Sequence, residues 1–355
     1  MPNPTKEVRL MSDSSPTWIG LDVGGAHLKV VHQEGAVRSH PFELWKRSDE
    51  LGATLRSLVA SFPHFDKVAL TMTAELCDCY PTKRDGVNAV LDAVVYAVNE
   101  RPISVWGIDG RFHELPGIRE RPGLAAASNW LASATLAARL VPLGPSILID
   151  IGSTTADLIP IGDGRVAARG RTDTERLQTG ELVYAGTRRT PLCAVASSLP
   201  YRNVETGLAA ELFATTHDVY LTLQEIPPDP TDRATADGRP ATIEAARDRL
   251  ARMIGADREE FSSADAEAFA RSVDLALLDR LAVTALRACE ETIGAPRSAI
   301  VAGSGEYLAR RLAERILPAD SKIIELTKAW GPVVSAAAPA FAVVVLARES
   351  DGGGP

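Results

Sequence analysis

The sequence predicts an α/β protein with two duplicated domains, and two observations support this prediction. Apolar, β-branched runs alternate with helical segments along the chain, which is typical of a mainly parallel sheet. A strand–turn–strand motif also occurs twice, at residues 18–33 and 146–163. The aligned residues Asp22 and Asp150 are 128 positions apart. That offset is too long for a solenoid repeat and suits a duplicated domain.

The second copy has the clearer pattern. Ile147–Ile151 is the β-branched run expected of a strand buried on both faces, and Ala156–Ile161 is the returning strand. Asp150 stands at the end of the first strand, beside a turn that Gly152 permits because it has no Cβ. The turn continues with three hydroxyl residues, Ser153, Thr154 and Thr155. Such a turn can donate hydrogen bonds to a phosphate while the aspartate holds a magnesium ion.

The first copy, Ile19–Val31, repeats the same order of residue types. Asp22 ends its first strand, and Gly24 and Gly25 form its turn. An isolated copy would be weak evidence, because aspartate and glycine commonly serve turn geometry alone. Since Asp22 and Asp150 occupy the same place in two copies, we favour a role for both as ligands of a phosphate-bound cation.

A third glycine-rich turn follows a buried strand at Ala299–Ala302 and precedes a helix expected from Glu306. Together the three turns resemble the phosphate-binding segments of the actin, Hsp70 and sugar-kinase superfamily. The resemblance implies an actin-like ATPase fold, in which two duplicated domains flank a cleft, with Asp22 and Asp150 as Mg²⁺ ligands. The phosphate-binding residues that it implies are Gly24, Gly25, Lys29, Gly152, Ser153, Thr154, Thr155, Gly303, Ser304 and Gly305.

The composition narrows the class of protein. The chain has 355 residues, enough for two domains with real cores, and 45% of them are hydrophobic. A net charge of −8 argues against a general nucleic-acid surface. Four cysteines do not make a disulfide framework, and the longest apolar run, Val333–Leu346, is too short to span a bilayer. We therefore expect a cytoplasmic protein with small-molecule substrates and no nucleic-acid or membrane partner; a homodimer is one option for its oligomeric state.

The expected domain boundaries follow the two hairpins. Residues 18–145 form the first domain and residues 146–347 the second, between a disordered extension at 1–17 and a disordered tail at 348–355. Residues 225–240 form a loop by their proline content, and residues 177–200 have a mixed pattern. The main helices are expected at residues 48–62, 87–99, 124–140, 207–223, 242–254, 263–293, 306–317 and 333–348.

Lys29 and Asp157 occupy equivalent places on the outgoing strands of the two hairpins. Lys29 alternates in phase with His27, so both side chains point to one face of the sheet. On the cleft face Lys29 would neutralise phosphate charge, and otherwise it is a solvated lysine. Asp157 could pair with Lys29 across the cleft or act as a base, and a structural ion pair is an equal alternative.

Polar residues also follow the strand expected at Lys67–Met72, where a parallel sheet places its ligands. Glu75 and Asp78 are paired carboxylates that could transfer a proton or hold a substrate amine. A polar loop over the sheet edge is the alternative. Cys77 and Cys79 have a C-x-C spacing without a second pair nearby, so a zinc site is not favoured.

Two further pairs attract attention. Arg188 and Arg189 lie in a threonine-rich stretch and could clamp an anion, although a solvated turn explains them as well. Asn129 and Trp130 lie on an alanine-rich helix, which the superfamily uses as an interdomain hinge. They could line the cleft, and ordinary packing is an equal alternative.

Three motifs together point to a narrower group: Leu21–Lys29, Thr71–Leu76 with Asp78, and Ile149–Ile161. They resemble proteins of the tetrahydromethanopterin-linked one-carbon pathway, which are related to the hydantoinase/oxoprolinase family. The resemblance implies a Mg²⁺-dependent transferase of methanofuran biosynthesis. It would join an aminomethyl-furanmethanol diphosphate to the phenol oxygen of γ-glutamyltyramine and release pyrophosphate, with Glu75, Asp78 or Asp157 as a catalytic carboxylate.

Two other readings stay open at the sequence level. The same turns could hold ATP in a kinase of a small metabolite or in a hydantoinase/oxoprolinase-like enzyme. They could also bind a nucleotide in a regulator without turnover, as in actin-like sensors. The sequence does not decide whether ATP or a substrate diphosphate occupies the site.

Overall fold

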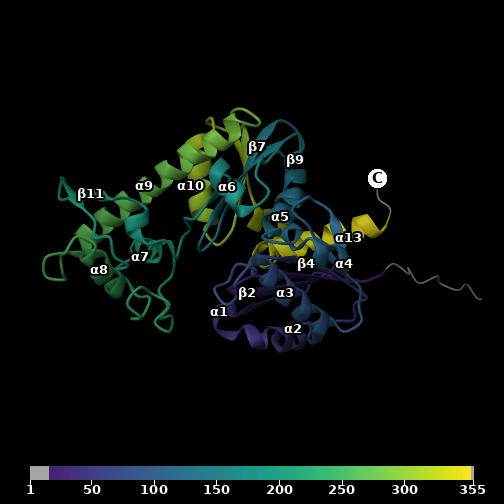
Figure 1. The fold of residues 1–355 in the computed structure, drawn as a ribbon. Coiled ribbons are helices and arrows are strands. Elements are labelled where there is room, and N and C mark those ends of the chain that lie inside the picture. Colours follow the sequence, from purple (N-terminus) through teal and green to yellow (C-terminus); the bar gives the residue numbers. More distant parts are fainter. Residues whose placement is uncertain (1–15, 353–355) are drawn as a thin grey trace, which may run out of the picture. The chain divides into compact units, whose positions relative to one another are not determined.

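A computed structural model describes residues 16–352 of the chain. These residues form two compact units, one from residues 16–133 and 337–352 and the other from Ala134–Ala336. The chain passes from the first unit to the second within helix α5 (Asn129–Ala137). Figure 1 shows the two units along the colour ramp, with the yellow C-terminal helix α13 belonging to the first of them.

The first unit is a six-stranded sheet with the strand order β3-β2-β1-β4-β5-β6. Strands β1, β4 and β5 are parallel, and β2, β3 and β6 are antiparallel to their neighbours. The elements of this unit are β1 (Trp18–Val23), β2 (His27–His32), β3 (Val37–Pro41), α1 (Leu44–Arg47), α2 (Leu51–Ala60), β4 (Lys67–Met72), α3 (Lys83–Val98), β5 (Ile103–Trp106), β6 (Phe112–Glu114), α4 (Leu115–Glu120) and α13 (Ala338–Asp351).

Helices cover both faces of this sheet because its central strands are apolar on both sides (Figure 1). Helices α2 and α3 pack with one face in a single core, whereas Val31 of β2 packs with Ala340 of α13 on the other. Gly20 of β1 makes the approach of α13 very close. A Cβ at Gly20 would lie 2.2 Å from the carbonyl oxygen of Ala340. A side chain at position 20 would therefore push the helix off the sheet.

The second unit is built on a sheet with the order β10-β8-β7-β13-β14, to which β9 adds by pairing with β8. Strands β11 and β12 form a separate hairpin. The elements are β7 (Pro145–Ile151), β8 (Ala156–Gly162), β9 (Arg165–Val166), α6 (Asp173–Thr179), β10 (Leu182–Val183), β11 (Ser198–Tyr201), β12 (Val204–Gly207), α7 (Thr216–Thr222), α8 (Ile243–Arg252), α9 (Ser263–Glu290), β13 (Ser298–Ala302), α10 (Glu306–Ile316), β14 (Lys322–Glu325), α11 (Leu326–Trp330) and α12 (Pro332–Ser335).

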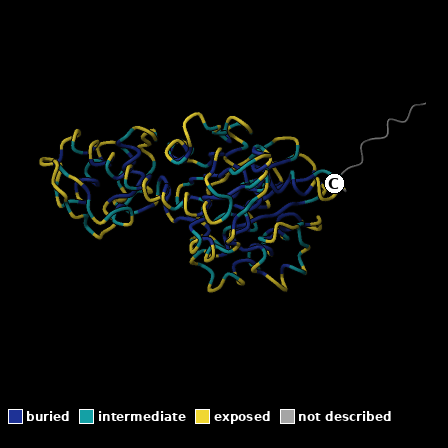
Figure 2. The backbone as a smooth tube through the Cα atoms, turned by 90° about the horizontal axis from the view of Figure 1, so that it is seen from above, coloured by how far each residue is buried: buried dark blue, intermediate teal, exposed yellow. Residues whose placement is uncertain are grey.

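Helix α9 organises this unit (Figure 1). Ser262 caps it in a reciprocal capping box with Asp265, which satisfies two otherwise unpaired backbone N–H groups. One face of α9 joins the core of the sheet together with α10, α7 and α8. Figure 2 shows the buried stretches of each unit in dark blue and the outer loops in yellow. No helix within residues 16–352 has the length and apolar character needed to cross a bilayer.

The duplication seen in the sequence is present in the backbone pairing. Asp22 is the register partner of Lys29 in β1–β2, and Asp150 is the register partner of Asp157 in β7–β8. The strand that follows each hairpin in the sheet, β4 or β13, runs parallel to the aspartate-bearing strand. The order β2-β1-β4-β5 of the first unit therefore corresponds to the order β8-β7-β13-β14 of the second.

Several element boundaries differ from the sequence expectation. Helix α13 packs in the first unit and extends to Asp351, so it is neither part of the second domain nor a disordered tail from residue 348. The expected helix at 124–140 is broken by Ala127 at φ 47° and begins at Asn129. The expected helix at 207–223 reduces to α7. Residues 1–15 and 353–355, where disorder was expected, lie outside the described residues.

Candidate active site

The first hairpin brings Asp22 and Lys29 together at the carboxyl end of β1. Lys29 Nζ lies 3.7 Å from Asp22 Oδ2, and the turn closes with a hydrogen bond from the Gly24 N–H to the His27 carbonyl at 3.0 Å. The Asp22 side chain is buried, whereas Lys29 keeps about a quarter of its side chain exposed at 27%. Lys29 is thus the accessible cation of this turn.

The Asp22 carboxylate lies in a buried environment, which disfavours its charged form. Burial raises the pKa of Asp22, and the charge of Lys29 and hydrogen bonds from Asn129 and Lys29 act against that rise. Within the described residues, Asp22 Oδ1 accepts no hydrogen bond. A buried carboxylate oxygen normally has a partner. One oxygen of Asp22 is therefore available to a group that the protein itself does not supply.

Asn129, for which the sequence left cleft lining and ordinary packing open, lies next to Asp22. Its helix, α5, begins beside the carboxyl end of β4, where the Ser128 N–H donates to the Met72 carbonyl at 3.2 Å. The hydroxyls of Ser128 and Thr71 lie 2.9 Å apart. These contacts bring the Asn129 amide within hydrogen-bonding reach of Asp22. An asparagine directly after a buried small residue at a helix start was the only local signal.

The loop after β4 packs against the same turn. The Thr73 N–H donates to the Val23 carbonyl at 3.0 Å, and a Cβ at Gly25 would lie 2.7 Å from Cys77 Sγ. Glu75 is almost fully buried, at 1% exposure, and Asp78 is exposed. Of the two paired carboxylates expected here, Glu75 is thus the one enclosed by the loop.

Cys77 behaves as a packed thiol. Burial, with further contributions from Cys79, Glu75 and Asp78, raises the pKa of Cys77 to about 11. A thiol that stays protonated at neutral pH is a poor metal ligand or nucleophile. All four cysteines are free, and no cluster of three or more potential metal-binding side chains of the His, Cys, Asp or Glu type occurs in residues 16–352.

The second hairpin has the same turn geometry. The Gly152 N–H donates to the Thr155 carbonyl at 2.9 Å, matching the Gly24–His27 bond of the first hairpin. Ser153 is exposed, and Asp150, Thr154 and Thr155 are half-buried. The turn therefore offers backbone N–H groups and hydroxyls at the surface beside the Asp150 carboxylate.

The third glycine-rich turn lies directly against this hairpin. Ala302 is the register partner of Asp150, so the chain turns at Gly303 beside the carboxyl end of β7. Gly303 has φ +90°, and a Cβ there would lie 2.2 Å from the Ile151 carbonyl oxygen. The Gly305 N–H donates to that same carbonyl at 2.8 Å. Glycine is required at position 303 both by its backbone conformation and by the close approach.

Residues 185–190, which include the arginine pair Arg188 and Arg189, pack against the same turn. The Thr187 N–H donates to the Gly152 carbonyl at 3.0 Å, and the N–H groups of Arg188 and Arg189 donate to the Ser153 carbonyl at 3.0 and 2.9 Å. A Cβ at Gly186 would lie 2.5 Å from the Ser153 carbonyl carbon. These contacts fix the backbone of the hairpin turn.

Asp157 has the structural partner that the sequence analysis weighed as an alternative. Its Oδ1 accepts a hydrogen bond from Arg176 Nη2 at 2.6 Å, and the Arg176 side chain is only 1% exposed. Arg176 Nη2 also donates to the Glu181 carbonyl at 3.1 Å. The geometry favours an ion pair that anchors α6 to β8, and a role of Asp157 as a base stays a prediction.

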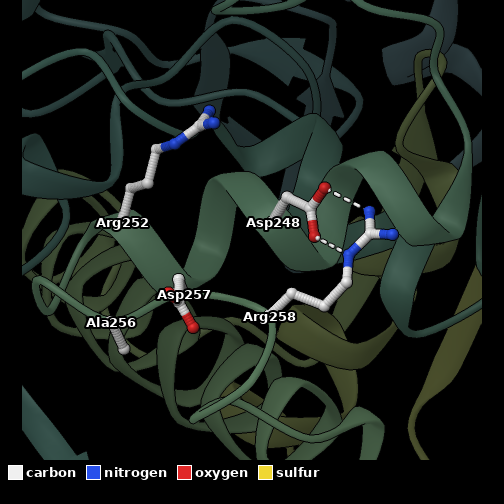
Figure 3. A pocket seen from close by; sticks show the side chains of 5 residues that line it. All are labelled: Asp248, Arg252, Ala256, Asp257 and Arg258. Atoms are coloured by element: carbon white, nitrogen blue, oxygen red, sulfur yellow. Dashed lines mark hydrogen bonds and ion pairs between the residues drawn. The ribbon is translucent and has the colours of Figure 1, made fainter.

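A small surface pocket also lies in the second unit, between α8 and the loop that follows it (Figure 3). Two of its charged groups pair with each other: Arg258 donates to both oxygens of Asp248, at 2.9 and 2.5 Å. The lining is completed by Arg252, Ala256 and Asp257. Arg252 pairs with Asp237 outside the lining at 3.3 Å, and Asp257 accepts a hydrogen bond from the Glu259 N–H at 2.8 Å. Charged groups that are already paired in this way are more consistent with structural support than with a reaction site.

Two hairpins with a terminal aspartate, each supported by a glycine-rich or small-residue loop, define the class. This is an α/β protein of the actin-like ATPase fold, with an aspartate-bearing hairpin in each unit. In structure the chain is similar to an acetone carboxylase solved without nucleotide, with a TM-score of 0.53 and 12% identity over 93% of this chain and 70% of that one. That likeness concerns the fold alone.

The chain belongs to the hydantoinase/oxoprolinase family, whose profile matches residues 66–348. It is 34% identical over 337 residues to the (4-{4-[2-(γ-L-glutamylamino)ethyl]phenoxymethyl}furan-2-yl)methanamine synthase of Methanocaldococcus jannaschii, covering 93% of this chain and 97% of that protein. It is 32% identical over 203 residues to the synthase of the same name from Methanococcus vannielii, covering 57% of this chain and 90% of that protein.

Proposed function

We propose that this protein is a transferase that forms an aryl ether in methanofuran-type cofactor biosynthesis. The substrates would be an aminomethyl-furanmethanol diphosphate and γ-glutamyltyramine, and the products the ether and pyrophosphate. The observation that carries the proposal is the 34% identity to the Methanocaldococcus jannaschii synthase across 97% of its length. The name of that relative describes a phenoxymethyl-furan. The proposed reaction would form the ether bond between the phenol oxygen and the methylene carbon of that group.

The phosphate-type turns suit a diphosphate leaving group. The furan methylene–oxygen bond to the diphosphate would break while the phenol oxygen bonds to the methylene carbon. Negative charge then grows on the departing diphosphate, and backbone N–H donors with Lys29 would stabilise it. The phenol proton would pass to a carboxylate, for which Glu75 is our first candidate because it is enclosed beside the Asp22 turn.

Magnesium is the cation that fits these residues. Asp22 in the first unit and Asp150 in the second each offer a hard oxygen ligand. A single carboxylate, with the substrate phosphates and water completing the shell, is a common way to hold Mg²⁺. The Asp22 Oδ1 atom, which accepts no hydrogen bond from the described residues, is consistent with such a ligand. When bound, the cation would neutralise charge on the diphosphate.

The proposal is tested by mixing the purified protein with Mg²⁺ and both substrates, and measuring pyrophosphate together with the ether by mass spectrometry. A parallel reaction replaces the furan diphosphate with ATP and furanmethanol. Ether and pyrophosphate in the first reaction are expected. Absence of both products would overturn the transferase proposal, and phosphate transfer from ATP would replace it with a kinase.

Lys29→Gln gives a matched test of the first turn. Loss of a charge-assisted contact to the diphosphate is expected to raise KM about tenfold or more, since such contacts contribute ~1.5–3 kcal/mol. Lys67→Gln is the control, because Lys67 also pairs with an aspartate of the first unit and is 29% exposed, close to the 27% of Lys29. Equal effects of the two substitutions on KM would count against phosphate binding by Lys29.

A further inference from the structure

The second hairpin lacks the cation that the first one has. Where Lys29 stands in the first hairpin, Asp157 stands in the second, as its register partnership with Asp150 shows. The arginine beside it, Arg176, is 1% exposed and already bonded to Asp157. A diphosphate bound at the turn Gly152–Thr155 would therefore need its positive partner from another part of the unit.

Arg188 is placed to be that partner. Its backbone N–H donates to the Ser153 carbonyl at 3.0 Å, so its Cα is tied to the turn itself. The preceding Gly186 packs so closely on the turn that it has no room for a Cβ. The Arg188 side chain nevertheless remains accessible, with 35% of its surface exposed. A guanidinium here can form two parallel hydrogen bonds to phosphate oxygens.

The side chain of Arg188 is held by the proline-rich loop. Its Nη2 forms an ion pair with Asp232, a residue of the segment 225–240. Although partial burial opposes it, the Ala234 N–H and Arg188 hold the pKa of Asp232 below its usual value. The backbone on either side of Asp232 is held together, because Asp229 and Ala241 pair as an isolated β-bridge. Asp232 is thus a charged, fixed anchor for the guanidinium.

His217 interacts electrostatically with both members of this ion pair. It is 3% exposed, and burial together with the charge of Arg188 lowers its pKa to about 4. At neutral pH the imidazole is uncharged and adds no cation of its own. Its helix, α7, is bonded to the segment 185–190, since Thr216 Oγ1 donates to the Gly186 carbonyl at 2.7 Å. Arg188 is therefore a cation that this corner of the unit presents, next to the exposed Arg189, and it is the one whose guanidinium is paired with the proline-rich loop.

We propose that Arg188 binds the diphosphate at the second hairpin and that Asp232 is the positioning residue that holds its guanidinium ready. When a diphosphate arrives, its oxygens compete with the Asp232 carboxylate for the same N–H donors. The segment 225–240, which has no counterpart in the first unit's hairpin, thereby gains a role in substrate binding. This inference rests on the proposed function in taking a diphosphate as the ligand.

The test compares Arg188→Ala with Asp232→Ala, because both remove the same ion pair. Binding of inorganic pyrophosphate in the presence of Mg²⁺ is measured by calorimetry on the full chain, and the unfolding midpoint of each variant in urea is recorded. Arg188→Ala is expected to weaken pyrophosphate binding at least tenfold. Asp232→Ala is expected to bind as the wild type does or more tightly, because the competing carboxylate is gone.

Two further variants complete the design. Arg188→Lys keeps the positive charge but loses the forked guanidinium that can form two parallel hydrogen bonds, so an intermediate affinity is expected. Arg202→Ala removes an exposed arginine that pairs with Asp265 in the same unit, and should leave pyrophosphate binding unchanged. A merely structural pair would give Arg188→Ala and Asp232→Ala the same affinity change, and that outcome overturns the inference.

The inference and the proposed function fail separately. If the wild type binds pyrophosphate through Arg188 but forms no ether from the furan diphosphate, only the proposed reaction is lost. If the wild type forms the ether while Arg188→Ala binds pyrophosphate normally, only the role of Arg188 is lost. A wild-type protein that binds no pyrophosphate overturns the role of Arg188 as well.

Discussion

Replacing Gly303 by alanine is the perturbation that most directly tests how the third turn is built. Two separate penalties apply at this position. The backbone has φ +90°, a conformation that costs an L-residue ~1–3 kcal/mol. The new Cβ would also lie 2.2 Å from the Ile151 carbonyl oxygen and 2.4 Å from Asp150 Oδ1. Such overpacking costs a further ~1–3 kcal/mol.

Two other glycines of the same unit separate these penalties. Gly144 has φ +77° with nothing within 4 Å of its Cβ position, so Gly144→Ala carries the conformational penalty alone. Gly186 has no positive φ but a Cβ contact at 2.5 Å, so Gly186→Ala carries the steric penalty alone. We expect each single-penalty variant to lose ~1–3 kcal/mol and Gly303→Ala to lose about the sum, ~2–6 kcal/mol.

The assay is urea unfolding of each variant, followed by circular dichroism and analysed by linear extrapolation. Gly303→Ala should also weaken pyrophosphate binding, since its Cβ would displace the Asp150 carboxylate. If Gly303→Ala is no less stable than Gly144→Ala, the close packing of the third turn on the hairpin is wrong. If it is destabilised but binds pyrophosphate normally, the turn is structural and takes no part in phosphate binding.

Three further predictions concern single side chains. Asp157→Asn should lower the free energy of unfolding by ~2 kcal/mol, because it leaves the buried Arg176 charge without its anion. A large fall in kcat with unchanged stability would instead indicate that Asp157 acts as a base. Gly20→Ala should cost ~1–3 kcal/mol in urea unfolding because it pushes α13 off the sheet, whereas Gly117→Ala, with open space at its Cβ position, should cost nothing; equal values would contradict the close approach. Cys77, with its pKa raised to about 11, should react with iodoacetamide at pH 8 at least ~20-fold more slowly than free cysteine, and faster only as the pH approaches 11. A rate midpoint near pH 8.5 would show that the surroundings of the half-buried thiol do not raise its pKa.

The paired hairpins could be predicted because their signals are local. A strand buried on both faces needs only a short apolar run, and a tight turn needs only glycine and hydroxyl residues within a few positions. The predicted equivalence of Lys29 and Asp157 is confirmed, since they are the register partners of Asp22 and Asp150. The strand boundaries of β4 and the helix start at Glu306 followed from the same kind of pattern.

The helix expected at 207–223 and the break at Ala127 could not be predicted in this way. Both depend on contacts with distant parts of the chain. Helix α7 begins where the Thr216 N–H donates to the Thr190 carbonyl, and next to Ala127 the Ser128 N–H donates to the Met72 carbonyl. Residue types alone favoured a longer helix in each case. Long-range contacts overrode that preference, as they commonly do when the intrinsic propensities differ by less than about 1 kcal/mol per residue.

By itself, the amino-acid order determined which residues end each strand and which form each turn, because those choices depend on neighbours one to four positions away. Only the tertiary structure decided the partners of these residues. It brought Arg176 to Asp157, the Asn129 amide to Asp22 and residues 185–190 to the Ser153 turn. Each of these contacts joins segments between 19 and 107 positions apart. Such pairings arise from packing whole elements into one core, and no short stretch of sequence encodes them.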